Sequence, residues 1–124
     1  GFWLVEEKET GQFVGELGYH YMKREVETPL RDLPEAGWAL LPQHHGKGYA
    51  TEGMEAAVKW IDTRFPDSAT WSIMLEVHEQ SQKVALRCGS ASMNFWSAAS
   101  SSCLAATSFN RSMPTSLPRA RSRP

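Results

Sequence analysis

Two glycines, Gly46 and Gly48, stand one residue apart between an apolar run and a series of helix-forming residues. The apolar run stops at Pro42, and helix formers follow the second glycine. This order predicts a strand, a tight glycine loop and the first turn of a helix. A helix N-terminus presents backbone N–H groups without intrahelical partners and the positive end of the helix dipole. The junction is therefore a candidate anion site, phosphate being the usual anion, and glycine lets the backbone approach the ligand closely.

Glycine loops of this kind also occur in ordinary turns, and other phosphate-binding motifs fit this one poorly. A Rossmann dinucleotide site needs a third glycine or alanine three residues after Gly48, where Thr51 stands, and a βαβ unit that the sequence does not predict before the loop. A Walker loop needs Gly-Lys followed by serine or threonine, whereas Gly48 follows Lys47. The spacing favours a phosphate site of another type.

The two adjacent histidines, His44 and His45, suggest a metal site, but the rest of the sequence does not support one. The other histidines show no ligand spacing, and the two cysteines, Cys88 and Cys103, lie in unrelated segments. The cysteines do not form a disulfide framework and are expected to be free thiols. Free thiols fit a reducing cytoplasm, and no metal is expected.

Length and composition are those of one modest domain. A chain of 124 residues can bury a small core, and no run of eighteen apolar residues predicts a membrane span. The first residues lack the basic region and cleavage site of a signal peptide, so a cytoplasmic location is predicted. The chain begins with Gly1 rather than Met, which we interpret as a fragment or a trimmed sequence.

Residue patterning predicts the order β-β-β-α-β-α up to Gly89. The first two strands form an antiparallel hairpin around a turn, and a polar loop with two prolines precedes the third. Apolar residues at helical spacing follow the glycine loop, with Pro66 after them. The predicted strands are 2–5, 13–22, 35–41 and 70–77, and the predicted helices are 50–65 and 78–88.

The character of the chain changes from Ser90 onward. All 14 acidic residues lie at or before Glu79, whereas the last thirty-five residues are rich in serine and arginine. No strand alternation is visible beyond Trp96, so we predict a domain at 1–89 and a tail at 90–124. One interpretation is that the reading frame was lost near Gly89 or that the tail is foreign sequence. The alternative is a natural disordered extension. Its arginines lie among prolines with little aromatic interleaving, which does not favour nucleic-acid binding.

The string Gln43-x-x-Gly46-x-Gly48 resembles the Gln/Arg-x-x-Gly-x-Gly/Ala signature of the GNAT superfamily of N-acetyltransferases. The following residues, Gly48-Tyr49-Ala50-Thr51-Glu52, resemble the sequence of the branch of this superfamily that acetylates the N-terminal alanine of ribosomal proteins and related amines. The resemblance covers about residues 2–89. It implies an α+β fold with a mostly antiparallel central sheet and a splayed parallel strand pair around the coenzyme site. The family's N-terminal elements and its last two strands are not visible in this sequence.

The resemblance implies acetyl transfer from acetyl-coenzyme A to a primary amine, on a protein N-terminus or a small molecule, by direct attack on the thioester. The loop would hold the pyrophosphate, and the pantetheine arm would pair with strand backbone between 35–41 and 70–77. A backbone N–H near Leu40 or Leu41 would stabilise the oxyanion. The implied coenzyme-binding residues are Ala39, Leu40, Leu41, Gln43, His44, His45, Gly46, Lys47, Gly48, Tyr49, Ala50 and Thr51.

Three residues are candidates for proton transfer. Glu35 stands where the family often has a glutamate, and it would act as the base that keeps the amine neutral. The alternative for Glu35 is an exposed carboxylate at a hairpin edge, and Glu76 is a weaker candidate base. His78-x-x-Ser81 stands where this branch commonly has Asn-x-x-Ser. Ser81 would contact the coenzyme sulfur or cap the last helix, and His78 would replace the amide contact of the family's asparagine or act as the acid.

Two alternative functions remain open from the sequence. The chain could be an inactive truncated fragment that binds coenzyme or nothing, since the family's first strand and first helices would precede Gly1. It could also be a Rossmann-type dinucleotide-binding domain, although the glycine spacing disfavours that interpretation.

Overall fold

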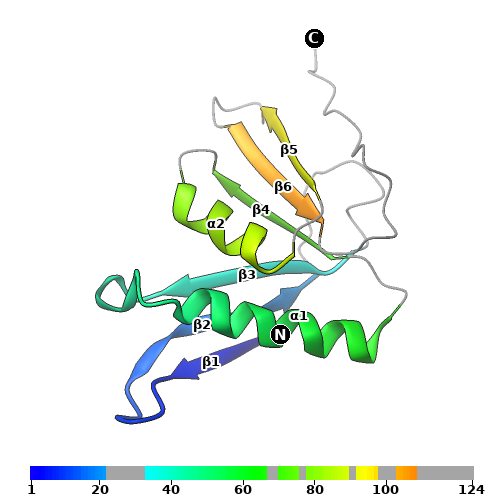
Figure 1. Ribbon diagram of the computed structural model, residues 1–124. Coiled ribbons are helices and arrows are strands. Elements are labelled where there is room, and N and C mark those ends of the chain that lie inside the picture. Colours follow the sequence, from blue (N-terminus) through cyan, green and yellow to red (C-terminus); the bar gives the residue numbers. More distant parts are fainter. Residues whose placement is uncertain (22–32, 67–69, 76–77, 90–91, 98–102, 109–124) are drawn as a thin grey trace.

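In the computed structural model, the described residues are 1–21, 33–66, 70–75, 78–89, 92–97 and 103–108. They form a mixed sheet with two α-helices and one short 3-10 helix (Figure 1). In chain order the elements are β1 (Phe2–Glu6), β2 (Phe13–His20), β3 (Glu35–Leu40), η2 (Pro42–His44), α1 (Tyr49–Arg64), β4 (Trp71–Leu75), α2 (Glu79–Arg87), β5 (Ser92–Ser97) and β6 (Cys103–Ser108).

The sheet has the strand order β1-β2-β3-β4-β6-β5, and its pairings are antiparallel except between β3 and β4. The predicted α+β fold, with a mostly antiparallel sheet around one parallel pair, is confirmed. A parallel pair requires a crossover connection, and α1 provides it between β3 and β4. Both helices cover the same face of the sheet in Figure 1, with α1 over β2 and β3 and α2 beside β4.

We expected no strand beyond Trp96, and this expectation is wrong, since the structure has one strand at Ser92–Ser97 and another at Cys103–Ser108. β6 pairs with β4 from Trp71↔Ser108 to Leu75↔Leu104, and β5 pairs with β6. Sheet ladders are built from backbone N–H and C=O groups, which serine- and alanine-rich segments supply as well as apolar ones. Cys103–Ser108 carries little hydrophobic alternation, so the sequence pattern did not reveal β6. The division at Gly89 itself stays a prediction, although sheet pairing continues beyond it.

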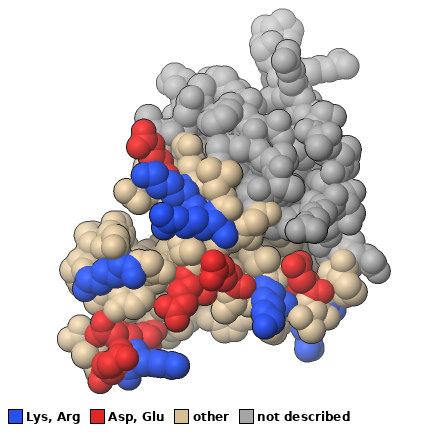
Figure 2. All heavy atoms as spheres, viewed as in Figure 1, with Lys and Arg blue, Asp and Glu red and all other residues tan. Residues whose placement is uncertain are grey.

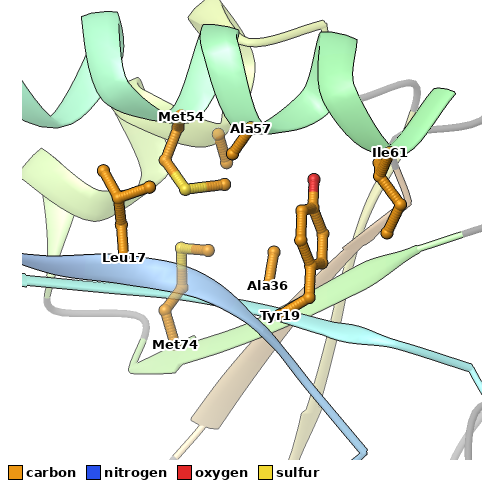
Figure 3. Packing of buried hydrophobic residues seen from close by; sticks show 8 residues of the cluster. Leu17, Tyr19, Ala36, Met54, Ala57, Ile61 and Met74 are labelled. Atoms are coloured by element: carbon orange, nitrogen blue, oxygen red, sulfur yellow. The ribbon is translucent and has the colours of Figure 1, made fainter. Parts of the chain in front are cut away.

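A core lies between the helices and the sheet, where β2, β3 and β4 face α1 and α2 (Figure 3). The predicted apolar stripe of α1 is confirmed at its centre, but Phe65 is 50% exposed. The helix ends at Arg64, and the backbone of Phe65 has already left the helical conformation. No described helix combines the length and apolar character that crossing a bilayer requires. The buried cluster consists of Leu17, Tyr19, Ala36, Met54, Ala57, Ile61, Met74 and Ala85.

Candidate functional site

The loop between β3 and α1 takes the conformation that its two glycines permit. Gly46 has φ +74° and Gly48 has φ +82°, a left-handed region that strains other residues. A Cβ atom added at either glycine would meet nothing within 4 Å. The glycines are therefore required by backbone conformation rather than by contact with the protein. The space beside them is open to a ligand.

Backbone amides gather at this loop. The first hydrogen bond of α1 runs from Glu52 N–H to Gly48 O at 3.0 Å, so the amides of the residues between them have no intrahelical acceptor. Gly48 is the N-cap and makes no side-chain capping bond. Within the described residues, no backbone acceptor is recorded for any amide from Gly46 to Thr51. These amides and the helix dipole form a candidate anion site.

Side chains on both sides of the glycines fix the loop. His45 Nε2 lies 2.9 Å from the carbonyl oxygen of Leu40, which ties the loop back to the end of β3. The His44 ring is 6% exposed and meets the Tyr49 ring edge-to-face, with 5.9 Å between centroids. Its Nδ1 atom is buried and has no hydrogen-bond partner among the described residues. Gln43 and Lys47, by contrast, are exposed.

A residue that sequence reasoning missed, Glu7, also belongs to this site. The Tyr49 hydroxyl donates a hydrogen bond of 2.5 Å to Oε1 of Glu7, which lies at the tip of the β1–β2 hairpin. Hydrogen bonds from the hydroxyls of Thr10 and Tyr49 lower the pKa of the Glu7 carboxyl, and the same carboxylate raises the pKa of the Tyr49 phenol. Only a turn signal marks this tip in the sequence, so nothing there linked it to the loop.

The parallel strands diverge soon after they meet. Glu35↔Trp71 is the single registered pair between β3 and β4 in the described residues, with Trp71 N–H donating to Pro34 O at 3.1 Å. Beyond this pair the two strands separate, as Figure 1 shows on the side of the glycine loop. The two backbones therefore diverge from Glu35 toward the end of β3 that precedes the glycine loop, and we call this divergence the gap.

Backbone alternation decides which strand groups face this gap. Leu41 N–H donates to Val14 O at 2.9 Å, on the side of β2. Since antiparallel partners alternate in direction, the amide of Ala39 also points to β2, and those of Trp38 and Leu40 point to the gap. Of the predicted arm-binding residues, Leu40 has its amide on the gap side, while the amide of Leu41 is already bonded elsewhere. Trp38 was missed because the register could not be assigned from sequence.

The three predicted catalytic residues line one pocket in this gap. The pocket has a volume of about 200 Å³ and lies where β3, β4 and the start of α2 meet. Strand splaying and the turn into α2 bring these residues together from three segments of the chain. Its lining residues are Glu35, Ala36, Gly37, Trp38, Ile73, Met74, His78 and Ser81.

The burial of Glu35 and the position of Ser81 in α2 each exclude one alternative stated above for that residue. Glu35 is 6% exposed, so the interpretation of an exposed edge carboxylate is wrong. Ser81 is not the cap of α2, because His78 is the N-cap and makes no side-chain capping bond. Ser81 instead lies in the first helical turn, half-buried against the pocket. Glu76 and most of the loop 23–34 lie outside the described residues.

The charges around the site are mixed. On the face drawn in Figure 2, basic and acidic side chains are interspersed over the described elements rather than gathered into one basic surface. Within the described part of the chain, no group of three or more His, Cys, Asp and Glu side chains is arranged to hold a metal ion. The arrangement can bind an anion at the loop and place a buried carboxylate, a histidine and a serine around a small neighbouring pocket.

The chain matches one family model and several solved structures. The family model described as acetyltransferase (GNAT) domain matches residues 1–91. Among curated proteins, no sequence matches the chain. A protein of Bordetella pertussis assigned to the GnaT acetyltransferase family superposes with a TM-score of 0.78 at 23% identity, over 89% of this chain and 65% of that one.

Two further similar structures are of proteins whose names state a specific acetyltransferase activity. A ribosomal-protein-S5-alanine acetyltransferase from Vibrio fischeri has a TM-score of 0.68 at 16% identity, over 91% of this chain and 63% of its own. A variant of the spermidine N-acetyltransferase from Vibrio cholerae has a TM-score of 0.66 at 14% identity, over 86% of this chain and 62% of its own. Likeness at these identities concerns the fold. The chain spans just under two thirds of the length of all three.

Proposed function

The chain belongs to the GNAT family of acetyltransferases, and on that premise we propose that it transfers an acetyl group from acetyl-coenzyme A to a primary amine. The observation that carries the proposal is the gap between β3 and β4. It begins at the Glu35↔Trp71 pair, contains the pocket lined by Glu35, His78 and Ser81, and lies beside β3, the strand that precedes the glycine loop. The family assignment excludes the Rossmann alternative, as does the antiparallel pairing of β3 with β2.

The chain's own groups fit the coenzyme. The loop amides and the N-terminus of α1 would bind its diphosphate, and the open space beside Gly46 and Gly48 leaves room for the phosphate oxygens. The gap-facing backbone of Trp38 and Leu40 would pair with the pantetheine arm as an added strand. The same amides are the candidate donors to the thioester oxygen as the amine attacks, since the Leu41 amide is bonded to Val14.

Glu35 is the proposed base. An attacking amine must be neutral, and alkyl amines are mostly protonated near pH 7. The buried carboxylate lines the pocket at the closed end of the gap, where it would take a proton from the amine directly or through water. As the nitrogen–carbon bond forms and the carbon–sulfur bond breaks, the departing sulfur needs a proton or a hydrogen bond. Ser81 and His78 line the same pocket and are the candidate donors.

The acceptor is proposed as an amine of a small molecule or of a protein N-terminus. Structures similar in fold include enzymes described as acting on spermidine and on a ribosomal-protein alanine. The pocket of about 200 Å³ has room for an alkylamine group, not for a folded partner. We also propose a cytoplasmic location, supported by the free thiol of Cys88.

Isothermal titration of the chain with acetyl-coenzyme A tests the proposal, with a nicotinamide dinucleotide as the competing ligand. We expect the chain to bind acetyl-coenzyme A and not the dinucleotide. We also expect coenzyme A to displace bound acetyl-coenzyme A. A coupled assay for released thiol, run over alkylamines, polyamines and alanine-terminated peptides, then tests turnover. Absence of coenzyme binding, or preference for the dinucleotide, contradicts the assignment.

An inactive coenzyme-binding chain is the second candidate function. The observation that favours it is the loop itself, whose amides would bind the coenzyme whether or not an amine is acetylated. In this case acetyl-coenzyme A binds, but no amine in the panel releases thiol. The two assays together distinguish the two candidates.

A further inference from the structure

We propose that Glu7 and Tyr49 form a latch through which the tip of the β1–β2 hairpin fixes the anion-binding loop. The two residues would be positioning residues for the diphosphate of the coenzyme, so the inference rests on the proposed function. Glu7 lies 42 positions before Tyr49 in the chain, and their hydrogen bond connects two elements that are not neighbours in sequence.

The hairpin tip holds Glu7 firmly. Its backbone N–H donates to Gln12 O at 2.9 Å, and its carbonyl accepts the N–H of Gly11 at 2.8 Å. The Thr10 hydroxyl donates to Oε2 of Glu7 at 2.6 Å, and Gln12 N–H donates to that hydroxyl at 3.2 Å. One carboxylate oxygen is thus held within the tip, and the other is left to accept from Tyr49. The acceptor is therefore fixed in place by its own hairpin.

Tyr49 connects the fixed carboxylate of Glu7 to the glycine loop. It is the first residue of α1 and follows Gly48 directly, so its own amide is one of the candidate anion donors. Its ring meets the buried ring of His44 at 5.9 Å, on the opposite side of the two glycines. Tyr49 and His44 together bracket the loop, and His45 closes it against Leu40.

The loop requires such an anchor because its local interactions are weak. Gly48 caps α1 without a side-chain hydrogen bond, and both glycines have more backbone freedom than other residues. The first turn of a helix frays when no cap holds it. If the loop becomes ordered only when the ligand binds, the entropy cost of ordering it lowers the affinity. A loop that is already ordered therefore binds the ligand more tightly.

The removal of one hydroxyl tests the latch. We expect Tyr49→Phe, which keeps the ring on His44, to weaken coenzyme A binding about fivefold, the order expected for one hydrogen bond. In a Glu7→Ala background the same change is expected to alter affinity by less than about twofold, because the bond is already gone. The matched controls are Tyr21→Phe, at an exposed tyrosine, and Glu9→Ala, which removes a carboxylate from the same hairpin.

Two readouts separate positioning from general damage. The loss of affinity is expected only for ligands that carry the diphosphate, so the dissociation constant of S-acetylpantetheine, which lacks it, is expected to differ by less than about twofold between wild type and Tyr49→Phe. Hydrogen exchange at the Glu52 amide, the first helical bond of α1, is expected to be faster in the variant, while amides in β2 stay protected. Additive effects of Glu7→Ala and Tyr49→Phe, or unchanged exchange at Glu52, overturn the latch. A wild type that binds no coenzyme A refutes the proposed function instead, and the exchange experiment still decides the latch.

Discussion

Glu35 of β3 pairs in register with Trp71 of β4, and no other registered pair joins these two strands in the described part of the chain. The Trp71 indole N–H donates to Leu33 O at 3.2 Å and its backbone N–H to Pro34 O at 3.1 Å, so this end of the strand pair is firmly closed. Glu35 therefore lies where the strands begin to diverge. A buried carboxylate at that point borders both the sheet and the pocket.

Replacing Glu35 with glutamine tests its role as base. Glutamine keeps the shape of the side chain but cannot take a proton, so we expect kcat to fall about 10²- to 10⁴-fold with the affinity for acetyl-coenzyme A nearly unchanged. Steady-state rates and isothermal titration measure the two quantities. Glu16→Gln, on an exposed position of β2, is the matched control. An unchanged kcat in Glu35→Gln would exclude Glu35 as the base.

Alanine at Gly48 separates backbone strain from ligand contact. Gly48 and Gly89 have φ of +82° and +86°, and an added Cβ meets nothing within 4 Å at either position. Both substitutions are expected to cost about 1–2 kcal/mol of stability, because a left-handed backbone strains an L-residue. In addition to this loss of stability, Gly48→Ala is expected to weaken coenzyme binding, because the added Cβ would face the diphosphate. Gly89→Ala is not expected to change coenzyme binding. Urea unfolding and titration check both, and equal affinity in the two variants would contradict a diphosphate site at this loop.

Much of the fold was predictable because its signals are local. Alternation in β2, the stripe of α1 and the glycines after β3 each reflect one element's own burial or backbone conformation. β6 was missed because its sheet pairing uses backbone groups and its Ala, Thr and Ser residues give little alternation, and the alternation that ends at Trp96 was not extended into β5. Trp38 and Glu7 were missed because strand register and the hairpin-to-loop contact are long-range relations. Glu35, His78 and Ser81 were found through the family resemblance rather than by physical pattern.

The core around Met54 is expected to be sensitive to truncation. Met54 is 0% exposed and packs with Leu17 and Met74 between α1 and the sheet (Figure 3). Met54→Ala removes buried apolar contacts and leaves a cavity, so we expect a loss of roughly 2–5 kcal/mol in the free energy of unfolding. Lys59→Ala, on the exposed side of the same helix, is expected to change it by less than about 0.5 kcal/mol. A small loss at Met54, measured by urea unfolding, would show that the core rearranges to fill the space.

The thiol of Cys88 is expected to react slowly in the folded chain. Burial raises its pKa to about 11, and the nearby charge of Glu55 acts in the same direction. Because the thiolate is the reactive form, alkylation by iodoacetamide at pH 8 should be about ten- to a hundredfold slower than in the urea-unfolded chain. Mass spectrometry of the peptide that contains Cys88 separates it from Cys103. Equal rates in the folded and unfolded chains would contradict the partial burial of Cys88, whose Sγ lies 3.7 Å from the carbonyl oxygen of Thr51 in α1.

The Glu7 carboxylate is expected to make stability depend on pH at the acidic end. Hydrogen bonds from Thr10 and Tyr49 lower its pKa below the ordinary value of 4.5, and the charges of Lys47 and His44 act in the same direction. A lowered folded-state pKa means that ionised Glu7 stabilises the fold above its unfolded pKa. This stabilisation is lost as pH falls through the folded-state pKa.

The free energy of unfolding of Glu7→Gln should therefore lie below that of wild type at pH 7, and the difference should shrink as the pH is lowered from about 5 to 3. Urea unfolding over this range measures it. Glu9→Gln reports the effect of removing one negative charge from the same hairpin without removing the bond to Tyr49. A difference between wild type and Glu7→Gln that is constant down to pH 3 would mean that the two hydroxyls do not favour the ionised carboxylate. The hydrogen bonds at the hairpin tip would then not hold Glu7 in the charged form that Tyr49 contacts.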